Sequence, residues 1–272
     1  MSAWRGVAPH DSESLLSLSS PLSSHPSSTP SLSLSLSLFS SPPSFLSLSG
    51  VEFLDTITPQ YIADLVVWGA IGARTTESQV HRQLASGMSC AIGFKNGTGG
   101  NVKVSVDACQ SSSMPHSFLS VTKDGVAAAV HTAGNSDCHI ILRGGSDGPN
   151  YFAANVAAAA EKMTKSGQQP RIIIDCSHGN SLKDHKRQMN VVEDICTQIA
   201  SGTTAIRGVM IESHLHEGKQ TLKPGITNLV HLKRGVSVTD ACVNVDETAV
   251  MLQKLASGVK ARRAFGLSEL LQ

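Results

Sequence analysis

Six side chains that follow short apolar runs are of the types that bind anions and divalent metals. They are Arg74, Lys95, Arg143, His178, Glu212 and Asp240. Arginine can bind a phosphate or carboxylate through two parallel hydrogen bonds, and lysine offers a point charge or a proton. Histidine with two carboxylates is a ligand set suited to Mn, Fe, Co or Zn. We therefore predict an anionic substrate beside a divalent metal ion that polarises a carbonyl group.

Each of these residues also has a structural explanation on its own. His178 could be a core histidine bonded to the backbone, Glu212 could pair with a lysine, and Asp240 could cap the next helix. Arg143 before two glycines fits a turn, and a cation at a strand end, such as Lys95, is commonly solvated. A shared site requires all six to meet at the carboxyl ends of parallel strands, where α/β barrels bind ligands.

Two neighbouring polar clusters carry less weight. The stretch 95–100 is glycine-rich but matches neither a Walker loop nor a dinucleotide fingerprint. A plain turn is the preferred interpretation, with backbone amides near a phosphate as the alternative. Glu212, His214 and His216 alternate as on a strand, so they could bind a metal together. His216 lies further into the loop, and we leave it out of the predicted site.

Apolar periodicity and glycine or proline stops predict alternating strands and helices. The predicted strands cover residues 51–54, 69–74, 91–95, 117–121, 126–132, 138–142, 171–175 and 205–211. The predicted helices cover residues 58–67, 77–86, 101–110, 151–166, 186–201 and 240–256. Thr58 is the expected cap of the first helix, and Val80 and Leu84 are expected to share one face of the second. This order predicts a parallel sheet of about six βα units, two short of a closed (β/α)8 barrel.

Composition excludes several classes of function. The 272-residue chain has a formal net charge of +1, so no global field attracts it to nucleic acid or to a membrane surface. Its 6 cysteines include no CxxC pair, so neither a zinc ribbon nor a redox pair is indicated. They are typical of reduced thiols, and we predict a cytoplasmic protein. No apolar run is long enough to span a bilayer.

Residues 1–50 differ from the rest, because they are mostly Ser, Leu and Pro, with Arg5 as the only Lys or Arg. We predict a disordered low-complexity segment, followed by a barrel domain over residues 51–272. A secretory signal, a mitochondrial leader and a chloroplast leader each fit poorly. Wrongly joined or non-coding sequence is the preferred interpretation. The Leu/Ser alternation at 31–39 has the period of a strand, so an edge strand there stays open.

From about residue 51 to 263 the chain resembles the class I 3-deoxy-D-arabino-heptulosonate-7-phosphate (DAHP) synthases of the microbial and fungal type. The matching stretches are long and in order. They include PQYIADLVVWGAIGARTTESQVHRQLASG, GFKNGT, HSFLSVTKDG, DCHIILRGG, PNY, IDCSHGNS, GVMIESHL, EGKQ and VTDAC.

The resemblance implies a TIM barrel that condenses phosphoenolpyruvate with erythrose 4-phosphate, the first step towards the aromatic amino acids. It implies that the cations of GART, GFKNG and ILRGG bind the phosphate and carboxylate of phosphoenolpyruvate. From its chemistry, Lys95 is also expected to supply or relay a proton. It implies that the histidine of CSHGN and the acids of IESHL and VTDAC bind the divalent metal. These are the same six residues.

Further expectations also come from the resemblance. His81, in QVHRQLASG, should lie near the active site. Ser89 and Phe118 match positions around a feedback site for an aromatic amino acid. The family forms dimers and tetramers, so a homo-oligomer is expected.

The sequence also departs from the family pattern. The family's first two barrel strands, a cysteine metal ligand, a Lys-Pro-Arg-Thr motif for erythrose phosphate and an N-terminal arm have no counterpart here. Smaller departures are Ala91, Gly99 and the pair Lys233 and Arg234. Loss of one ligand and one anion site should cost several decades in rate. We therefore expect a DAHP synthase chain with little or no activity. The alternatives are a non-catalytic truncated subunit, a faulty gene model, or a related aldolase acting on another sugar phosphate.

Overall fold

The computed structural model describes residues 5–7, 49–223, 225 and 229–269. The predicted low-complexity segment lies outside the described residues, except for 5–7, 49 and 50, and so does the alternating stretch 31–39. Within the segment expected to be disordered, Arg5–Val7 instead form strand β1.

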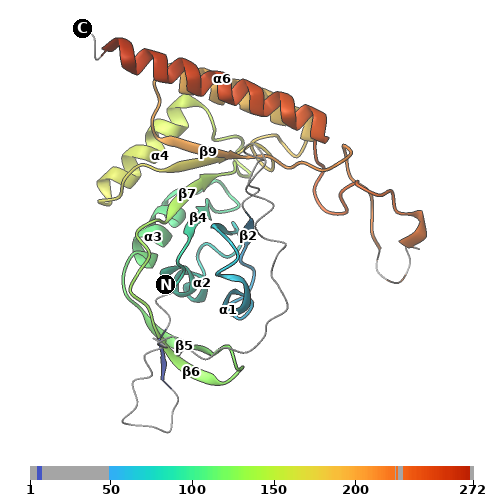
Figure 1. Cartoon of the computed structure of the whole chain (residues 1–272). Helices are drawn as coiled ribbons and strands as arrows, with labels where there is room; N and C mark the ends of the chain where they lie inside the picture. The colour runs from blue at the N-terminus through green and yellow to red at the C-terminus, as the bar shows by residue number, and fades with distance from the viewer. Residues whose placement is uncertain (1–4, 8–48, 224, 226–228, 270–272) are drawn as a thin grey trace, which may run out of the picture.

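The main body is one parallel sheet with helices along it (Figure 1). Its strand order is β2-β3-β4-β7-β8-β9, and every neighbouring pair is parallel. The strands are β2 (Gly50–Glu52), β3 (Trp68–Ile71), β4 (Ala91–Lys95), β7 (His139–Leu142), β8 (Ile172–Asp175) and β9 (Ile206–Met210). Within the described residues β2 and β9 are edge strands, so the sheet is an incomplete α/β barrel, as predicted.

Helices follow the strands as the sequence pattern predicts. They are α1 (Pro59–Ile62), α2 (Gln79–Ser86), α3 (Lys103–Ser112), α4 (Ala153–Lys165), α5 (Gln188–Ala200) and α6 (Val245–Glu269). Two short 3-10 helices, η2 (His185–Arg187) and η3 (Leu229–His231), lie before α5 and in the loop before α6. No helix in the described part of the chain combines the length and the apolar composition that crossing a membrane requires.

The period of two along each strand separates a helix-facing side from an inner side. Ile172 and Ile174 of β8 belong to the hydrophobic core with the helices, so Ile173 and Asp175 point to the other side. In β4, Phe94 is likewise part of that core, and Lys95 faces inward. The alternation therefore places Lys95 and Asp175 on the inner side at the carboxyl ends of their strands.

A small antiparallel sheet forms at the other end of the molecule (Figure 1). The predicted strands 117–121 and 126–132 correspond to β5 (Ser117–Val121) and β6 (Ala127–His131), which form an antiparallel hairpin, and β1 pairs with β6. The base of the hairpin is held at the ends of α2 and α3. Ser86 Oγ lies 2.7 Å from Thr132 Oγ1, and Asn135 Nδ2 donates to the Ala85 carbonyl. This end carries the amino termini of the strands.

The predicted first helix, 58–67, is wrong in length, because α1 has only 4 residues. Thr58 does not cap it with its side chain. Instead the Thr58 hydroxyl and backbone N–H both donate to the Asp55 carboxylate, and Ile57 N donates to it as well, which favours a turn. In α2, Leu84 is buried but Val80 is 53 % exposed, so these two residues do not share the buried face.

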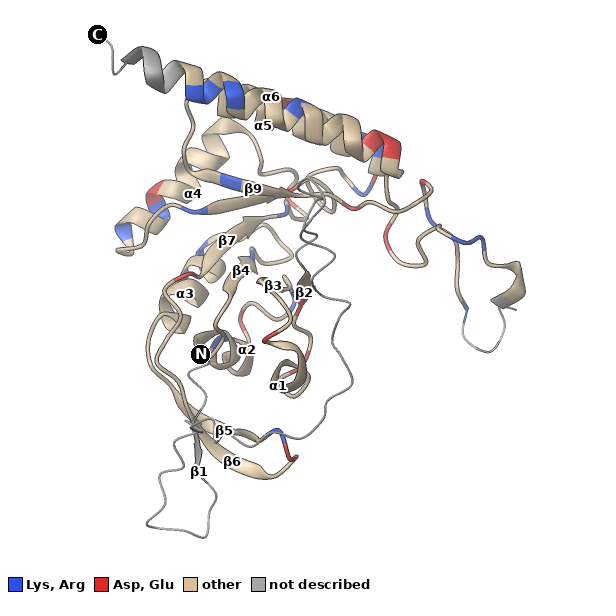
Figure 2. Ribbon diagram, in the orientation of Figure 1, with Lys and Arg blue, Asp and Glu red and all other residues tan. Residues whose placement is uncertain are grey.

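The last helix also differs from the prediction of 240–256. It begins at Val245, because Asn244 Oδ1 accepts from Glu247 N and so caps it. It continues through Gly258, where a Cβ would lie only 3.2 Å from the Cys196 carbonyl of α5. That glycine serves close helix packing and does not end the helix. Figure 2 shows acidic residues at the start of α6; they are Asp246 and Glu247, which match the helix dipole, whereas the last turn of α6 has no basic residue.

Candidate metal and anion site

Three of the predicted metal ligands converge. His178 Nε2 lies 3.9 Å from Glu212 Oε1 and 3.6 Å from Asp240 Oδ2. One ligand atom from each residue lies within 4.8 Å of the others. His178 and Glu212 are partly buried and Asp240 is exposed, so the group opens to solvent on one side. One imidazole nitrogen and two carboxylate oxygens in this arrangement fit a divalent transition metal.

The loop after β8 gives His178 its position. His178 has a φ of 52°, which lies in the left-handed region that few residues other than glycine adopt. This conformation turns the ring towards the other carboxylates immediately beyond the strand. Strained backbone of this kind occurs preferentially at functional sites.

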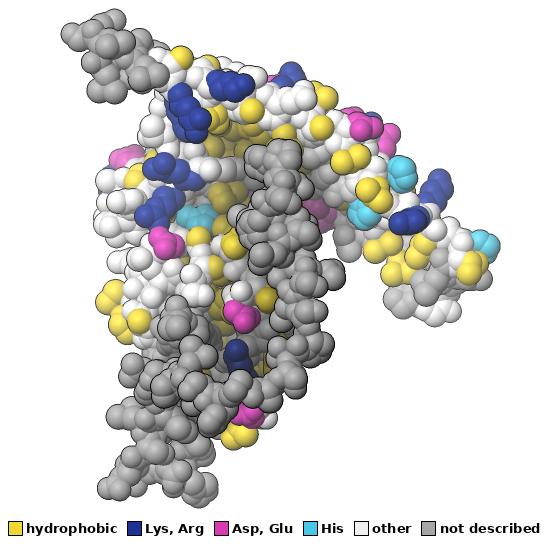
Figure 3. Space-filling model, in the orientation of Figure 1, with side chains coloured by type: hydrophobic (Ala, Val, Ile, Leu, Met, Phe, Trp, Pro, Cys, Tyr) yellow, Lys and Arg dark blue, Asp and Glu magenta, His cyan; other side chains and the backbone are white. Residues whose placement is uncertain are grey.

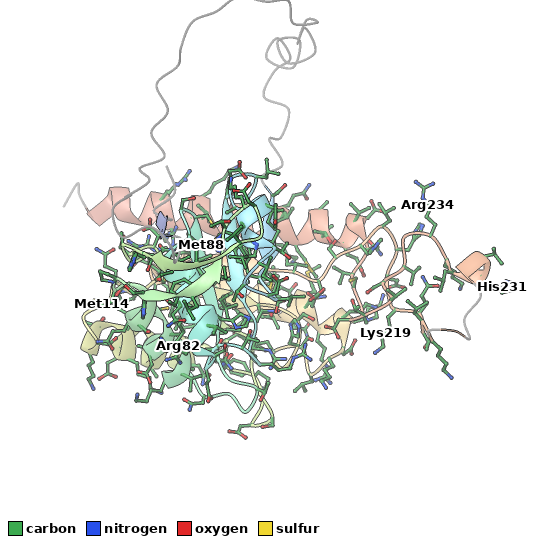
Figure 4. All side chains as sticks on the ribbon, turned by 90° about the horizontal axis from the view of Figure 1, so that it is seen from below. Arg82, Met88, Met114, Lys219, His231 and Arg234 are labelled. Atoms are coloured by element: carbon green, nitrogen blue, oxygen red, sulfur yellow. The ribbon has the colours of Figure 1, made fainter. Side chains whose placement is uncertain are left out.

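A two-sided arm, described over residues 213–223, 225 and 229–244, brings Asp240 back beside Glu212. Gly218 and Cys242 exchange two backbone hydrogen bonds, and Gln220 N donates to the Ser237 carbonyl. The arm projects from the body of the protein (Figures 1 and 3), and Lys219, His231 and Arg234 lie along it, apart from the sheet (Figure 4). Asp240 therefore does not cap α6, which is the alternative that the sequence left open.

Asp175 is a site residue that the sequence analysis missed. Its side chain is fully buried, with Oδ2 2.8 Å from His178 Nδ1 and 3.4 Å from Lys95 Nζ. Burial opposes the ionisation of Asp175, but the contact with His178, the charges of His178 and Lys95, and the N–H of Ser177 together lower its pKa. The available signal was an acid ending a buried apolar strand just before Cys-Ser-His. Asp175 orients His178 from behind, as a carboxylate commonly does for a metal-binding histidine.

The electrostatics of Glu212 differ from those of Asp175. Burial raises the pKa of the Glu212 carboxyl, and the Asp175 and Asp240 carboxylates raise it further, against the opposing charges of His178 and Lys95. Neighbouring carboxylates of this kind repel one another unless a cation lies between them. This supports the fit of the group to a metal ion.

The predicted cations lie along the same rim. Lys95 ends β4 and is buried, Arg143 follows β7 and is half-buried, and Arg74 follows β3 and is exposed. Because these strands are parallel, their carboxyl ends share one edge of the sheet. The three cations thus lie at the carboxyl end of the sheet, with His178 and Glu212, as predicted. Their roles in binding remain predictions.

Close backbone contacts fix the loops that carry these residues. A Cβ on Gly145 would lie 2.2 Å from Gly100 N, and one on Gly144 would lie 2.5 Å from the Gly179 carbonyl carbon. Glycine is therefore required where the loops after β4, β7 and β8 meet. The preferred plain-turn interpretation of 95–100 is consistent with the backbone hydrogen bond from Gly100 N to the Gly97 carbonyl.

Three buried asparagines connect the same loops. Asn96 Oδ1 accepts from Arg143 N, Asn150 Nδ2 donates to Asn96 Oδ1, and Asn150 N donates to Asn180 Oδ1. Asn180 Nδ2 in turn donates to the Leu142 and Asp175 carbonyls. No sequence signal indicates this network, since the hydrogen bonds that join different loops connect residues 30 to 54 positions apart.

The other predicted residues lie elsewhere. The His81 ring is buried, with Nδ1 2.8 Å from Ser78 Oγ and Nε2 3.3 Å from the Leu54 carbonyl oxygen just beyond β2. Ser89 precedes β4 and Phe118 lies in β5, so both are at the amino ends of the strands, opposite the metal group. His214 Nδ1 accepts from Leu215 N and stays outside the metal group.

A cavity of about 550 Å³ lies at the base of the arm, and none of the six predicted site residues lines it. Its lining includes His216, Lys233, Arg234 and the acids Glu217 and Asp246. Charges of both signs meet there, so it has no clear preference for an anion or a cation.

Sequence comparison gives long matches over the same part of the chain. The profile of the DAHP synthetase I family matches residues 47–253. The chain is 58% identical over 212 residues to the Phe-sensitive phospho-2-dehydro-3-deoxyheptonate aldolase of Escherichia coli K12, covering 78% of this chain and 59% of that protein. It is 55% identical over 214 residues to the tyrosine-inhibited enzyme of Schizosaccharomyces pombe, covering 78% and 57%.

The fold gives the same result. The structure of phospho-2-dehydro-3-deoxyheptonate aldolase from Francisella tularensis SCHU S4 superposes with a TM-score of 0.75 at 52% identity, covering 79% of this chain and 61% of that one. The chain thus spans about three fifths of the length of these relatives. From these matches and the convergent site, the chain belongs to the DAHP synthetase I family.

Proposed function

We propose that this chain binds phosphoenolpyruvate and a divalent metal ion as part of a DAHP synthase site, where phosphoenolpyruvate condenses with erythrose 4-phosphate to give DAHP and phosphate. The observation that carries the proposal is the convergence of His178, Glu212 and Asp240 within 4.8 Å at the strand ends that also carry Lys95. The names of the relatives, phospho-2-dehydro-3-deoxyheptonate aldolases, support it.

The cations would hold the acid substrate. Arg143 and Arg74 offer planar forks that match a phosphate or a carboxylate. Lys95 is buried and its Nζ is 3.4 Å from Asp175, so the ammonium is kept in place without being exposed to bulk water. It can neutralise developing charge and pass a proton to the reacting atoms.

His178, Glu212 and Asp240 would hold the metal ion, for which the ligand set suits Mn, Fe, Co or Zn. When bound, the metal would polarise the aldehyde of erythrose 4-phosphate. Asp175 would fix the ring of His178 for that role. The ring of His81 in α2, whose Nε2 lies 3.3 Å from the Leu54 carbonyl oxygen just beyond β2, would border the substrate. We propose that the protein is cytoplasmic and that it binds neither nucleic acid nor a membrane.

We also propose that an aromatic amino acid regulates the chain and that it forms a homo-oligomer. The relatives from E. coli and S. pombe are described as Phe-sensitive and tyrosine-inhibited. Ser89 and Phe118 would contact this effector at the amino ends of the strands, beside the β5–β6 hairpin. The effector would then act from the end of the sheet opposite the reaction.

A second candidate is a non-catalytic subunit of such an enzyme. The observation in its favour is the open sheet of the described residues, in which β2 and β9 are edges and Glu52 on the inner side of β2 is exposed. A subunit of this kind would bind ligands without turning over both substrates. Activity and binding must therefore be measured separately.

The test is calorimetric titration with Mn²⁺ and with phosphoenolpyruvate, followed by an assay of phosphoenolpyruvate absorbance with erythrose 4-phosphate. We expect Arg143→Gln to weaken phosphoenolpyruvate binding by about tenfold or more, since a charged hydrogen-bonding partner is lost. Arg171→Gln is the matched control, because Arg171 precedes β8 at the opposite end and pairs with Asp137. A folded chain that binds neither ligand would refute the proposal, and binding without turnover would favour the non-catalytic subunit.

A further inference from the structure

The backbone of Glu212 is held by one buried side chain from another element. Gln188, the first residue of α5, is 0 % exposed. Its Nε2 donates to the Glu212 carbonyl at 3.0 Å, and its Oε1 accepts from Glu212 N at 2.9 Å. The amide of Gln188 therefore pairs with both backbone polar groups of a predicted metal ligand.

This pairing replaces a strand neighbour that Glu212 lacks. The ladder between β8 and β9 ends with Asp175 opposite Met210, and Cys176 N still donates to the Met210 carbonyl. Beyond that point the chain after β8 turns away through His178, with its left-handed φ of 52°. Gln188 supplies the two hydrogen bonds that β8 would have given had it continued.

The backbone carbonyl of Glu212 also connects Glu212 to the segment that carries Asp240. Val243 N donates to the Glu212 carbonyl at 2.9 Å, on the returning side of the arm and three residues after Asp240. Glu212 is thus fixed between α5 and the segment that carries Asp240. A shift of its backbone would move its carboxylate relative to both His178 and Asp240.

We infer that Gln188 is a positioning residue, which holds Glu212 in the geometry that metal binding requires; this rests on the proposed metal site. Only a carboxamide offers one donor and one acceptor in this shape. Methionine at this position removes both hydrogen bonds and leaves the part-buried Glu212 N–H without its partner. Glutamate keeps an acceptor for that N–H but loses the donor to the carbonyl.

The chain contains a matched control in the same helix. Gln198 is also buried in α5, and its Nε2 donates to the Tyr151 carbonyl at 2.8 Å, away from the metal group. Gln198→Met therefore removes a comparable buried amide without touching Glu212. General weakening of α5 should affect both variants, whereas displacement of Glu212 should affect only Gln188 variants.

The experiment measures Mn²⁺ affinity by calorimetry and the visible absorption spectrum of the Co²⁺-loaded chain for wild type, Gln188→Met, Gln188→Glu and Gln198→Met. We expect affinity to fall by about 10- to 100-fold in folded Gln188 variants, with an altered Co²⁺ spectrum, and to change less than about twofold in Gln198→Met. Circular dichroism identifies the folded variants.

Unchanged Mn²⁺ affinity in either folded Gln188 variant overturns the inference while the proposed function stands. An equal loss in Gln198→Met also overturns it, because the effect would then be one of helix stability. Absence of Mn²⁺ binding in the wild type overturns the proposed metal site itself, and this inference with it.

Discussion

Asp175 and Lys95 form an ion pair from which water is almost excluded. The side chains are 0% and 7% exposed, and the Lys95 Nζ to Asp175 Oδ2 distance is 3.4 Å. Removing one partner of a buried pair leaves the other charge uncompensated, which costs about 3 to 5 kcal/mol. We expect Asp175→Asn to lower the free energy of unfolding by an amount of this order, measured by urea denaturation followed by circular dichroism.

An exposed pair provides the comparison. Lys103 and Asp107 form an i,i+4 pair on α3 with side chains 72% and 41% exposed. Solvent screens such pairs, so Asp107→Asn should change the free energy of unfolding by less than about 1 kcal/mol. If the two aspartate variants lose the same stability, the buried pair does not have the role assigned to it.

The buried side chain of His139 should make the free energy of unfolding depend on pH. Its Nε2 accepts from Trp68 Nε1 at 3.0 Å and its Nδ1 lies 3.2 Å from the Asp137 carbonyl, so the ring is neutral with its proton on Nδ1. Burial lowers the pKa of His139 in the folded chain, and Arg171 lowers it further, against the opposing effect of the Asp137 carbonyl. The unfolded chain, with a pKa of about 6.5, then binds more protons just below that pH.

The neutral, buried ring of His139 therefore makes its full contribution to the free energy of unfolding above a pH of about 6.5. This contribution is lost as the pH falls from there towards the pKa of His139 in the folded chain. We expect the free energy of unfolding to decrease from pH 7 to 5 more steeply in the native sequence than in His139→Gln. The chain has 2 tryptophans, so Trp68 fluorescence in a Trp4→Phe background reports the local change. Parallel pH profiles for the two proteins would contradict this assignment.

At the scale of elements, the loops after the strands pack backbone against backbone. A Cβ on Gly145 would lie 2.2 Å from Gly100 N, whereas one on Gly208 in β9 would first meet Ile173 at 3.7 Å. We expect Gly145→Ala to destabilise the chain by about 1 to 3 kcal/mol through overpacking, and to weaken phosphoenolpyruvate binding by moving Arg143. Urea denaturation and calorimetry measure the two effects.

Gly208→Ala is the control for this change, because its contact distance is ordinary and its φ is not in the left-handed region. It should leave phosphoenolpyruvate binding unchanged. Equal effects of the two substitutions would show that the loop contact does not position Arg143.

A close backbone contact of the same kind explains why the predicted last helix, 240–256, stops too early, just before Gly258. That glycine is a contact with α5, which no local pattern reveals.

At the scale of the whole molecule, the cysteines report the integrity of the fold. Five of the 6 are buried, and only Cys196 is partly exposed. Burial raises the pKa of each thiol, to about 12 for Cys138, and the thiolate is the reactive form. We expect DTNB at pH 8 to modify Cys196 first in the native chain and all 6 cysteines in urea, followed at 412 nm.

Cys196→Ser should remove the fast phase and leave the slow one. Rapid modification of several thiols in the native chain would mean that the sheet opens readily at β2 and β9, which are its edges within the described residues. Adding Mn²⁺ and phosphoenolpyruvate should slow the remaining modification, because a ligand that binds only the folded state stabilises it.

The sequence by itself predicted the order of the strands and helices and six candidate site residues, of which all but Asp240 follow or end a strand of the sheet. Apolar runs with period two set which side each strand residue faces, and parallel strands necessarily bring their carboxyl ends to one edge. The sequence alone therefore assigns Lys95, Arg143 and Glu212 to that edge of the sheet. The lengths of α1 and α6 were not predicted correctly. Helix α1 ends at Ile62, and α6 begins at Val245, where Asn244 Oδ1 accepts from Glu247 N, and continues through Gly258.

Only the tertiary structure decided how these residues meet. The amide of Gln188 on Glu212 and the arm that returns Asp240 to His178 are contacts between segments far apart in the chain. The left-handed φ of His178 and its contact with the buried Asp175 belong to the conformation of the loop after β8. Such contacts depend on loop conformation and on close packing, for which periodicity carries no information. Residue types thus predicted what the site can bind, and the folded backbone decided the distances between its ligand atoms.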